Sequence, residues 1–151
     1  MSTVDLIYEA QSRLQDNIRE TPLLSSPFID QLAGRRVIIK AECLQHTGSF
    51  KYRGAWSAIS SLSDEVRTRG VLAYSSGNHA QGIAAVAKRF NSPAIIIMPS
   101  DAPKLKIKNT KLMGAEVILY DRSKHSREDI GEKISFERGL MLIKPYDDSL
   151  V

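Results

Sequence analysis

Residues 71–87 read VLAYSSGNHAQGIAAVA. The first four form a short apolar run of β-compatible residues, and from Ile83 onward the apolar positions recur at helical spacing. Small and polar residues fill the junction between these two runs. The stretch therefore predicts a strand, a tight turn and a helix.

The same alternation extends outward in both directions along the chain. We predict strands at 36–42, 71–74, 94–98, 115–119 and 140–143, and helices at 3–19, 27–33, 50–62, 78–90, 103–113 and 125–138. Strands that alternate with helices favour parallel βαβ units. The predicted fold class is α/β, with an open, twisted parallel sheet flanked by helices.

The predicted turn at residues 75–79 carries the first functional signal. Gly77 allows another group to approach the backbone closely. The free amides at the start of the following helix, with the hydroxyls of Ser75 and Ser76, can bind a carboxylate or a phosphate. Ligands of open α/β sheets gather at the carboxyl ends of the strands, which is where this turn lies.

The second signal is the stretch 40–55, KAECLQHTGSFKYRGA, which predicts a strand, a Gly-Ser turn and a helix that begins near Ser49. Lys51 then lies in the first helical turn, where the helix dipole disfavours a cation by about 0.3–1 kcal/mol. The same field favours the neutral amine, the nucleophilic form that a Schiff-base lysine needs. The alternative is that Lys51 points into water.

Together these stretches resemble the threonine dehydratase and serine racemase family of pyridoxal-phosphate enzymes, which have the fold type II (tryptophan synthase β-like) architecture. The resemblance continues in collinear order over nearly the whole chain. It includes ETPLL at 20–24, MPSDAP at 98–103, GAEV at 114–117 and PYDD at 145–148.

The resemblance implies a role for each matching residue. Lys51 would form the Schiff base with pyridoxal 5'-phosphate and act as the general base. Phe50 would pack against the cofactor ring, and Asn78 would bond to its phenolic oxygen. Ser76 matches the serine that acts as acid or base in racemases. The substrate carboxylate would be received by Ser75, Ser76, Gly77, Asn78 and His79.

The activity implied is elimination: a small hydroxy amino acid such as threonine or serine would yield a 2-oxo acid and ammonia. A serine or aspartate racemase, or a dehydratase of hydroxyaspartate or of the hydroxyectoine pathway, are alternatives within the family. A catalytically inactive fragment or an interaction module derived from such an enzyme is the alternative outside it. The full-length form is expected to be a homo-oligomer.

Family members continue past the point where these residues end, with a glycine-rich loop that holds the cofactor phosphate. The nine glycines of this chain include no adjacent pair. We therefore expect an N-terminal piece that is truncated before the phosphate loop and is inactive alone. Residues 1–45 would belong to an incomplete larger domain, and residues 46–151 would form the small domain.

Composition and residue spacing argue against several other kinds of protein. The net charge is +4, but no aromatic residues interleave with the lysines at 104–111, which argues against nucleic-acid binding. The longest apolar run, 94–98, is too short to span a membrane. The three histidines have no metal-binding spacing. A single cysteine, Cys43, which we expect to be buried, and the lack of a signal pattern suggest a cytoplasmic protein.

Overall fold

The computed structural model describes residues 3–148 and 150–151. A four-stranded parallel sheet forms its centre, with the strand order β5-β4-β3-β6. The strands are β3 (Val71–Tyr74), β4 (Ala94–Pro99), β5 (Glu116–Tyr120) and β6 (Met141–Leu142). The helices of this region are α3 (Lys51–Ser61), α4 (Asp64–Arg69), α5 (Asn78–Arg89), α6 (Lys104–Leu112) and α7 (Arg127–Arg138). The α/β prediction is confirmed.

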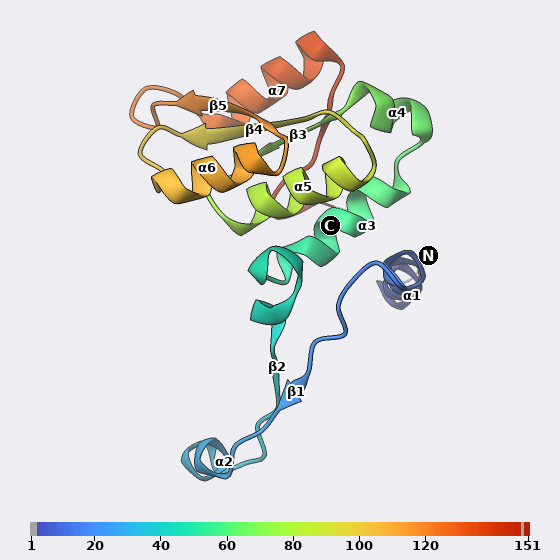
Figure 1. Cartoon of the computed structure of the whole chain (residues 1–151), viewed down its shortest axis with the longest axis vertical. Helices are drawn as coiled ribbons and strands as arrows, with labels where there is room; N and C mark the ends of the chain where they lie inside the picture. Colours follow the sequence, from blue (N-terminus) through green and yellow to red (C-terminus); the bar gives the residue numbers. More distant parts are fainter. Residues whose placement is uncertain (1–2, 149) are drawn as a thin grey trace.

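The order of the strands reverses beside β3. The chain runs outward from β3 through β4 to β5, and then returns through α7 to place β6 on the other side of β3. Figure 1 shows α7 on one face of the sheet and α5 and α6 on the other. A crevice at such a reversal is where open α/β sheets bind their ligands.

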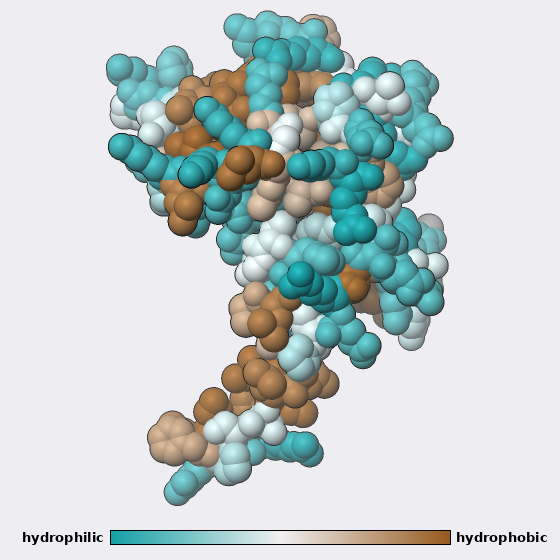
Figure 2. All heavy atoms as spheres, in the orientation of Figure 1, coloured by the Kyte–Doolittle hydropathy of each residue, from teal (hydrophilic) through white to brown (hydrophobic). Residues whose placement is uncertain are grey.

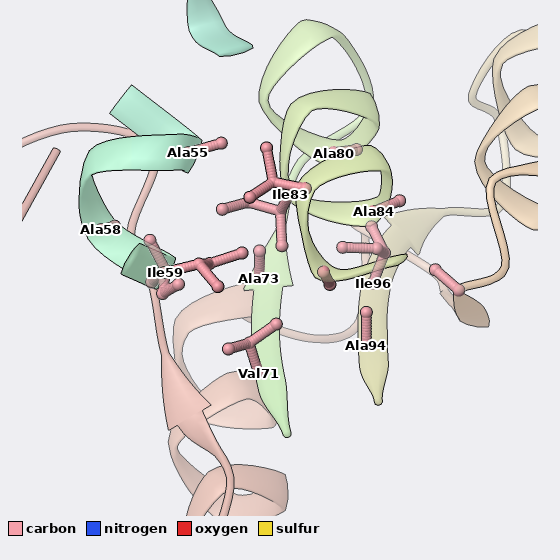
Figure 3. Close-up of a cluster of buried hydrophobic side chains, with 14 of the residues drawn as sticks. Ala55, Ala58, Ile59, Val71, Ala73, Ala80, Ile83, Ala84, Ala94 and Ile96 are labelled. Atoms are coloured by element: carbon pink, nitrogen blue, oxygen red, sulfur yellow. The ribbon is translucent and has the colours of Figure 1, made fainter. Parts of the chain in front are cut away.

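The core lies on both faces of β3 and β4, all of whose residues are buried. This is the pattern of parallel strands covered by helices on each side. On the α3 and α5 face the side chains are mostly small, and Figure 3 shows alanines and isoleucines from both helices packed over the two strands. Alanine on these faces lets the two helices come close to the sheet and to each other.

The N-terminal part is arranged differently. Helix α1 (Thr3–Leu14) lies beside α3, where the Trp56 indole N–H donates to the carbonyl of Arg13 at 2.8 Å. The chain then forms the arm, residues 22–40, which projects away from the sheet (Figure 1). The arm contains β1 (Leu23–Leu24), α2 (Pro27–Ala33) and β2 (Ile39–Lys40), and β1 pairs with β2 in the antiparallel sense.

No residue of the arm is buried, although many are apolar. Figure 2 shows hydrophobic side chains gathered on this projecting segment. The largely exposed ones are Leu23, Leu24, Phe28, Leu32, Ile38 and Ile39. The arm thus carries an apolar surface that the described residues leave uncovered.

Several predicted elements differ from the observed ones. The helix predicted at 3–19 ends at Leu14, before Asp16, whose φ of +64° is incompatible with a continuing helix. The strand predicted at 36–42 is reduced to β2 and is followed by the 3₁₀ turns η1 (Glu42–Leu44) and η2 (His46–Gly48). Helix α4, which the Ser63 side chain caps, was not predicted. The prediction that Cys43 is buried is wrong, because this residue is exposed in η1.

Candidate active site

Lys51 is the first residue of α3, which places it in the first helical turn as the sequence predicts, although the helix begins one residue later than expected. Its Nζ donates a hydrogen bond to the carbonyl oxygen of Pro145 at 2.6 Å, and lies 5.5 Å from the centre of the Phe50 ring. Phe50 is 58% exposed. The amine is therefore held at a defined place beside β6 and does not point freely into water.

The turn that precedes Lys51 is tight and polar. Thr47 and Gly48 both have φ in the left-handed region, at +60° and +73°. The hydroxyls of Thr47 and Ser49 are buried and have no hydrogen-bond partner among the described residues. Buried hydroxyls normally find partners. Unpaired ones in the turn just before Lys51 are the kind of group that a bound polar molecule would satisfy.

The predicted substrate loop lies at the carboxyl end of β3. Ser75 extends the strand by donating its backbone N–H to Ile97, and the Gly77 N–H donates to the Ser75 hydroxyl at 3.2 Å. Gly77 is the N-cap of α5, and no side chain caps that helix. The first backbone N–H groups of α5 are thus free to bind an anion. Ser76 and Asn78 are exposed there.

His79 is the buried member of this loop. Its Nε2 lies 3.1 Å from the carbonyl oxygen of Ile143, so Nε2 carries the hydrogen and Nδ1 is an acceptor. Nδ1 is buried and has no partner among the described residues. Burial lowers the pKa of His79, and the nearby positive charge of Lys51 lowers it further, which together outweigh the hydrogen bond to Ile143. The ring is neutral at pH 7.

A close helix contact brings the two predicted stretches together. A Cβ placed on Gly82 of α5 would lie 3.2 Å from the carbonyl oxygen of Lys51 and 3.5 Å from the Cβ of Ala55. Glycine at this position therefore lets the start of α3 approach the first turns of α5. The segment after β6 completes the arrangement, since Ile143 and Pro145 accept hydrogen bonds from His79 and Lys51.

Sequence reasoning missed two kinds of functional group here. The carbonyl groups of Ile143 and Pro145 carry no sequence signal, because any residue has one. Arg122 and Arg127 line a cavity with Ser75 and Ser76 at the same edge of the sheet. Part of their signal was available: Arg122 lies two residues after the carboxyl end of β5, whereas Arg127 is the first residue of α7. The charge-rich stretch around them reads as a solvated helix start.

Comparison with known proteins identifies the family. The family model described as "Pyridoxal-phosphate dependent enzyme" matches residues 14–151. This chain belongs to that family. The prediction of a pyridoxal 5'-phosphate cofactor is thereby confirmed at the level of the family.

Members of this pyridoxal-phosphate family resemble the chain closely. An L-threo-3-hydroxyaspartate ammonia-lyase of Saccharomyces cerevisiae is 46% identical over 93% of this chain and 43% of that protein. A serine racemase of Schizosaccharomyces pombe is 44% identical over 97% of this chain and 46% of that protein. The solved structure of maize serine racemase has a TM-score of 0.90 and 41% identity over 96% of this chain and 44% of that chain. The chain spans a little under half the length of these relatives.

Two further observations concern other kinds of site. Within residues 3–148 and 150–151, no three His, Cys, Asp or Glu side chains are grouped so that they could hold a metal ion. The same residues include no helix with the length and apolar character of a membrane span.

Proposed function

We propose that this chain carries the lysine and the substrate loop of an enzyme that eliminates water from a small β-hydroxy amino acid and releases a 2-oxo acid and ammonia. The observation that carries the proposal is the position of Lys51. Its amine lies at the start of α3, fixed by Pro145, where α3 packs against the uncapped first turn of α5.

The residues around Lys51 fit pyridoxal 5'-phosphate as the cofactor. Buried polar atoms of Thr47, Ser49 and His79 have no partner among the described residues, which fits a place where a bound polar group supplies one. Lys51 and the exposed ring of Phe50 would hold the cofactor, with Asn78 at its phenolic oxygen. When bound, the cofactor serves as an electron sink for the substrate Cα.

The chain's own groups bind the substrate, remove its Cα proton and position the loop. The free backbone amides of Asn78 and His79, at the uncapped start of α5, and the hydroxyl of Ser75 bind and orient the substrate carboxylate. The Lys51 amine is the general base that removes the Cα proton. The neutral ring of His79 positions the loop through its hydrogen bond to Ile143.

Racemisation of serine or aspartate is a second candidate, and the exposure of Ser76 favours it. A racemase needs a second acid or base on the substrate face opposite the lysine. The Ser76 side chain is exposed in the substrate loop, where it can meet a bound substrate. The ratio of 2-oxo acid to inverted amino acid, measured on the same sample, decides between the two activities.

The domain assignment is also part of this proposal. Residues 1–45 belong to a larger domain, and residues 46–151 form the small domain that carries the site. The uncovered apolar side chains of the arm support this division. We expect the whole enzyme to form a homo-oligomer. A polypeptide of these 151 residues alone is expected to bind the cofactor weakly and to turn over little substrate. If reduction with borohydride in the presence of the cofactor left no pyridoxyl label on this polypeptide, an inactive fragment would be favoured.

The role of Lys51 can be tested by chemical labelling. The cofactor-loaded enzyme that contains this chain is treated with borohydride, and the pyridoxyl mass increment is mapped by peptide mass spectrometry. The label is expected on Lys51, and Lys51→Ala should abolish both the label and elimination. Lys108→Ala is the control, because Lys108 is exposed on α6. A label spread over surface lysines, or elimination retained by Lys51→Ala, would refute the assignment.

A further inference from the structure

The position of the Lys51 amine depends on the backbone that follows β6. Within the described residues, the Pro145 carbonyl is the hydrogen-bond acceptor that Nζ meets, at 2.6 Å. A lysine side chain is long and flexible, so ordering it costs conformational entropy. A carbonyl can set the place of such a side chain only if its own backbone is fixed. Pro145 lies in the β6 turn, residues 144–148, and what fixes this turn also fixes the amine.

Asp148 closes the β6 turn. The Lys144 backbone N–H donates to its Oδ2 at 2.8 Å, and the Leu150 N–H donates to its Oδ1 at 2.9 Å. The backbone carbonyl of Asp148 accepts from the Val151 N–H at 3.2 Å. Hydrogen bonds to an ionised carboxylate are stronger than those between neutral groups. One residue thus binds the chain both before and after Pro145.

The backbone inside the turn has little freedom of its own. The ring of Pro145 fixes its φ at about −65°. Asp147 has a φ of +49°, in the left-handed region that aspartate and asparagine occupy more readily than most residues. Just before the turn, Ile143 is fully buried and accepts a hydrogen bond from His79. The Pro145 carbonyl therefore keeps one direction as long as Asp148 closes the turn.

The chain after the turn returns to the helix that carries Lys51. Leu150 packs against the core cluster that α3 and α5 share. Val151 lies against Gly54 of α3, where an added Cβ would be 2.6 Å from Cγ1 of Val151. Figure 1 shows this end of the chain beside α3. The turn is therefore anchored on both sides of the amine, at Ile143 before it and on α3 after it.

Tyr146 adds a weaker anchor on the outer side of the turn. Its hydroxyl accepts from Nη2 of Arg127 at 3.0 Å and donates to Oε1 of Glu128 at 3.3 Å. Tyr146 is 51% exposed, so water competes for these bonds. Closure of the turn therefore depends mainly on Asp148.

The charge of Asp148 also reaches the site. Burial lowers the pKa of His79, and the charge of Lys51 lowers it further, whereas the charge of Asp148 raises it. A test of the turn therefore has to separate the hydrogen bonds of Asp148 from its charge.

We propose that Asp148 is a positioning residue for Lys51: it closes the β6 turn, and the closed turn holds the Pro145 carbonyl where it keeps the amine in its reacting position. This role rests on the proposed function of Lys51 as the Schiff-base lysine and general base. Asp148 acts through Pro145 and takes no proton itself. A displacement of about 1 Å in a reacting group can cost about 100-fold in rate, so a loosened turn would slow the reaction without removing any catalytic group.

Steady-state kinetics on the cofactor-loaded enzyme that contains this chain test the role. With serine or threonine, Asp148→Ala should lower kcat for elimination roughly 10- to 100-fold and change KM less than about threefold, because the amine is misplaced while the carboxylate-binding amides remain. Asp148→Asn keeps one oxygen for the Lys144 N–H and should fall between Asp148→Ala and the wild type.

Asp147→Asn is the matched control, because it removes the same charge from the exposed neighbouring residue and keeps a residue type that tolerates positive φ. It should leave kcat and KM within about twofold of the wild type. An unchanged kcat in Asp148→Ala, or a loss in KM alone, would overturn the proposal. Asp148→Asn as slow as Asp148→Ala would show that the charge matters and not the closure, which also overturns it.

The reactivity of Lys51 in the cofactor-free protein gives a readout that does not depend on turnover. Reductive methylation with formaldehyde and cyanoborohydride is mapped by peptide mass spectrometry, with the exposed Lys108 as the internal reference. Lys51 is half-buried, and its methylation should become roughly 2- to 10-fold faster in Asp148→Ala, the change expected when one hydrogen bond is lost. Pyridoxyl labelling of Lys51 should instead become slower, because the cofactor needs a positioned amine.

These opposite changes distinguish positioning from a general loosening of the fold, which would also raise methylation of other half-buried lysines such as Lys106. Circular dichroism verifies that Asp148→Ala is folded. If it is not, Tyr146→Phe, which releases only the outer side of the turn, should show the same pattern with smaller changes. Unchanged methylation of Lys51 in a folded variant would refute the role of the turn.

The two proposals can fail separately. If the wild type eliminates no water but methylation of Lys51 still rises in Asp148→Ala, the proposed reaction is wrong while the positioning role stands. If the wild type eliminates water and Asp148→Ala does so with the same kcat, the positioning role alone is wrong.

Discussion

At the scale of single residues, Glu42 connects the arm to the helix that carries Lys51. Arg53 of α3 donates to both carboxylate oxygens of Glu42, at 2.8 and 2.6 Å, and the Thr21 hydroxyl donates at 2.6 Å. These bonds, those from Arg53 first, lower the pKa of Glu42 from 4.5 to about 2. A bidentate pair of this geometry is stronger than a single surface contact.

The Glu42 contact predicts a defined dependence of stability on pH. Since the pKa is lower in the folded state, the stabilisation is complete above about pH 4.5 and is lost as the pH falls toward about 2. Glu42→Gln should lower the free energy of unfolding by about 2 kcal/mol at pH 7, and this difference should shrink below pH 4.5. Urea unfolding at several pH values measures it.

Glu65→Gln is the control for that measurement, because Glu65 forms an exposed pair with Arg69 on α4. It should change the free energy of unfolding by no more than about 0.5 kcal/mol. If the difference between the wild type and Glu42→Gln were the same at pH 3 and pH 7, the assigned cause would be wrong.

At the scale of elements, the contact between α3 and α5 decides how close Lys51 lies to the turn at residues 75–79. Gly82 sets the spacing, since any larger residue would meet the carbonyl of Lys51 and the methyl group of Ala55. The carbonyl belongs to backbone inside a helix and cannot turn aside as a flexible side chain does. The two helices must then separate.

Gly82→Val should therefore lower the free energy of unfolding by about 1–3 kcal/mol through overpacking. In the full enzyme it should also slow pyridoxyl labelling of Lys51, since the amine moves away from the loop. Lys88→Val, which places the same side chain on the exposed part of α5, is the control; it loses about 0.5 kcal/mol or less of helix propensity, whereas Gly82→Val loses none. Equal losses in the two variants would show that the close contact does not matter.

The individual elements were largely predictable. The strand at 71–74 and the helix at 27–33, which Gly34 ends with φ of +62°, agree with the structure residue for residue. Their signals are local: apolar periodicity and a glycine at the helix end. The strand predicted at 36–42 was too long because only Ile39 and Lys40 find a partner strand, and strand pairing is not local.

At the scale of the whole molecule, the arm and the sheet region contribute differently to stability. The apolar side chains of the arm contact water, whereas most of those of α3, α5, β3 and β4 are almost completely buried. Burial of apolar area is the main favourable contribution to folding. The stability of a polypeptide of these 151 residues should therefore depend on the sheet region and not on the arm.

Substitutions on the arm test this division. Phe28 and Leu32 are 68% and 74% exposed, so Phe28→Glu and Leu32→Glu should change the free energy of unfolding by less than about 0.5 kcal/mol, while reducing self-association in light scattering. Ile59→Ala, in the core, should cost about 2–5 kcal/mol. Large losses from the two arm variants would show that the arm is part of the folding core.

The sequence alone determined the α/β class, a lysine in the first turn of a helix and a polar turn after a buried strand, because each depends on neighbouring residues and on the periodicity of the backbone. Only the tertiary structure decided what these groups meet. Lys51 bonds to Pro145, 94 positions away, and His79 bonds to Ile143, because β6 returns to lie beside β3. Arg127 lines a cavity with Ser75 and Ser76 for a similar reason, since α7 crosses the sheet face that carries Tyr74. Contacts of this kind follow from the order of the strands, which local residue patterns do not encode.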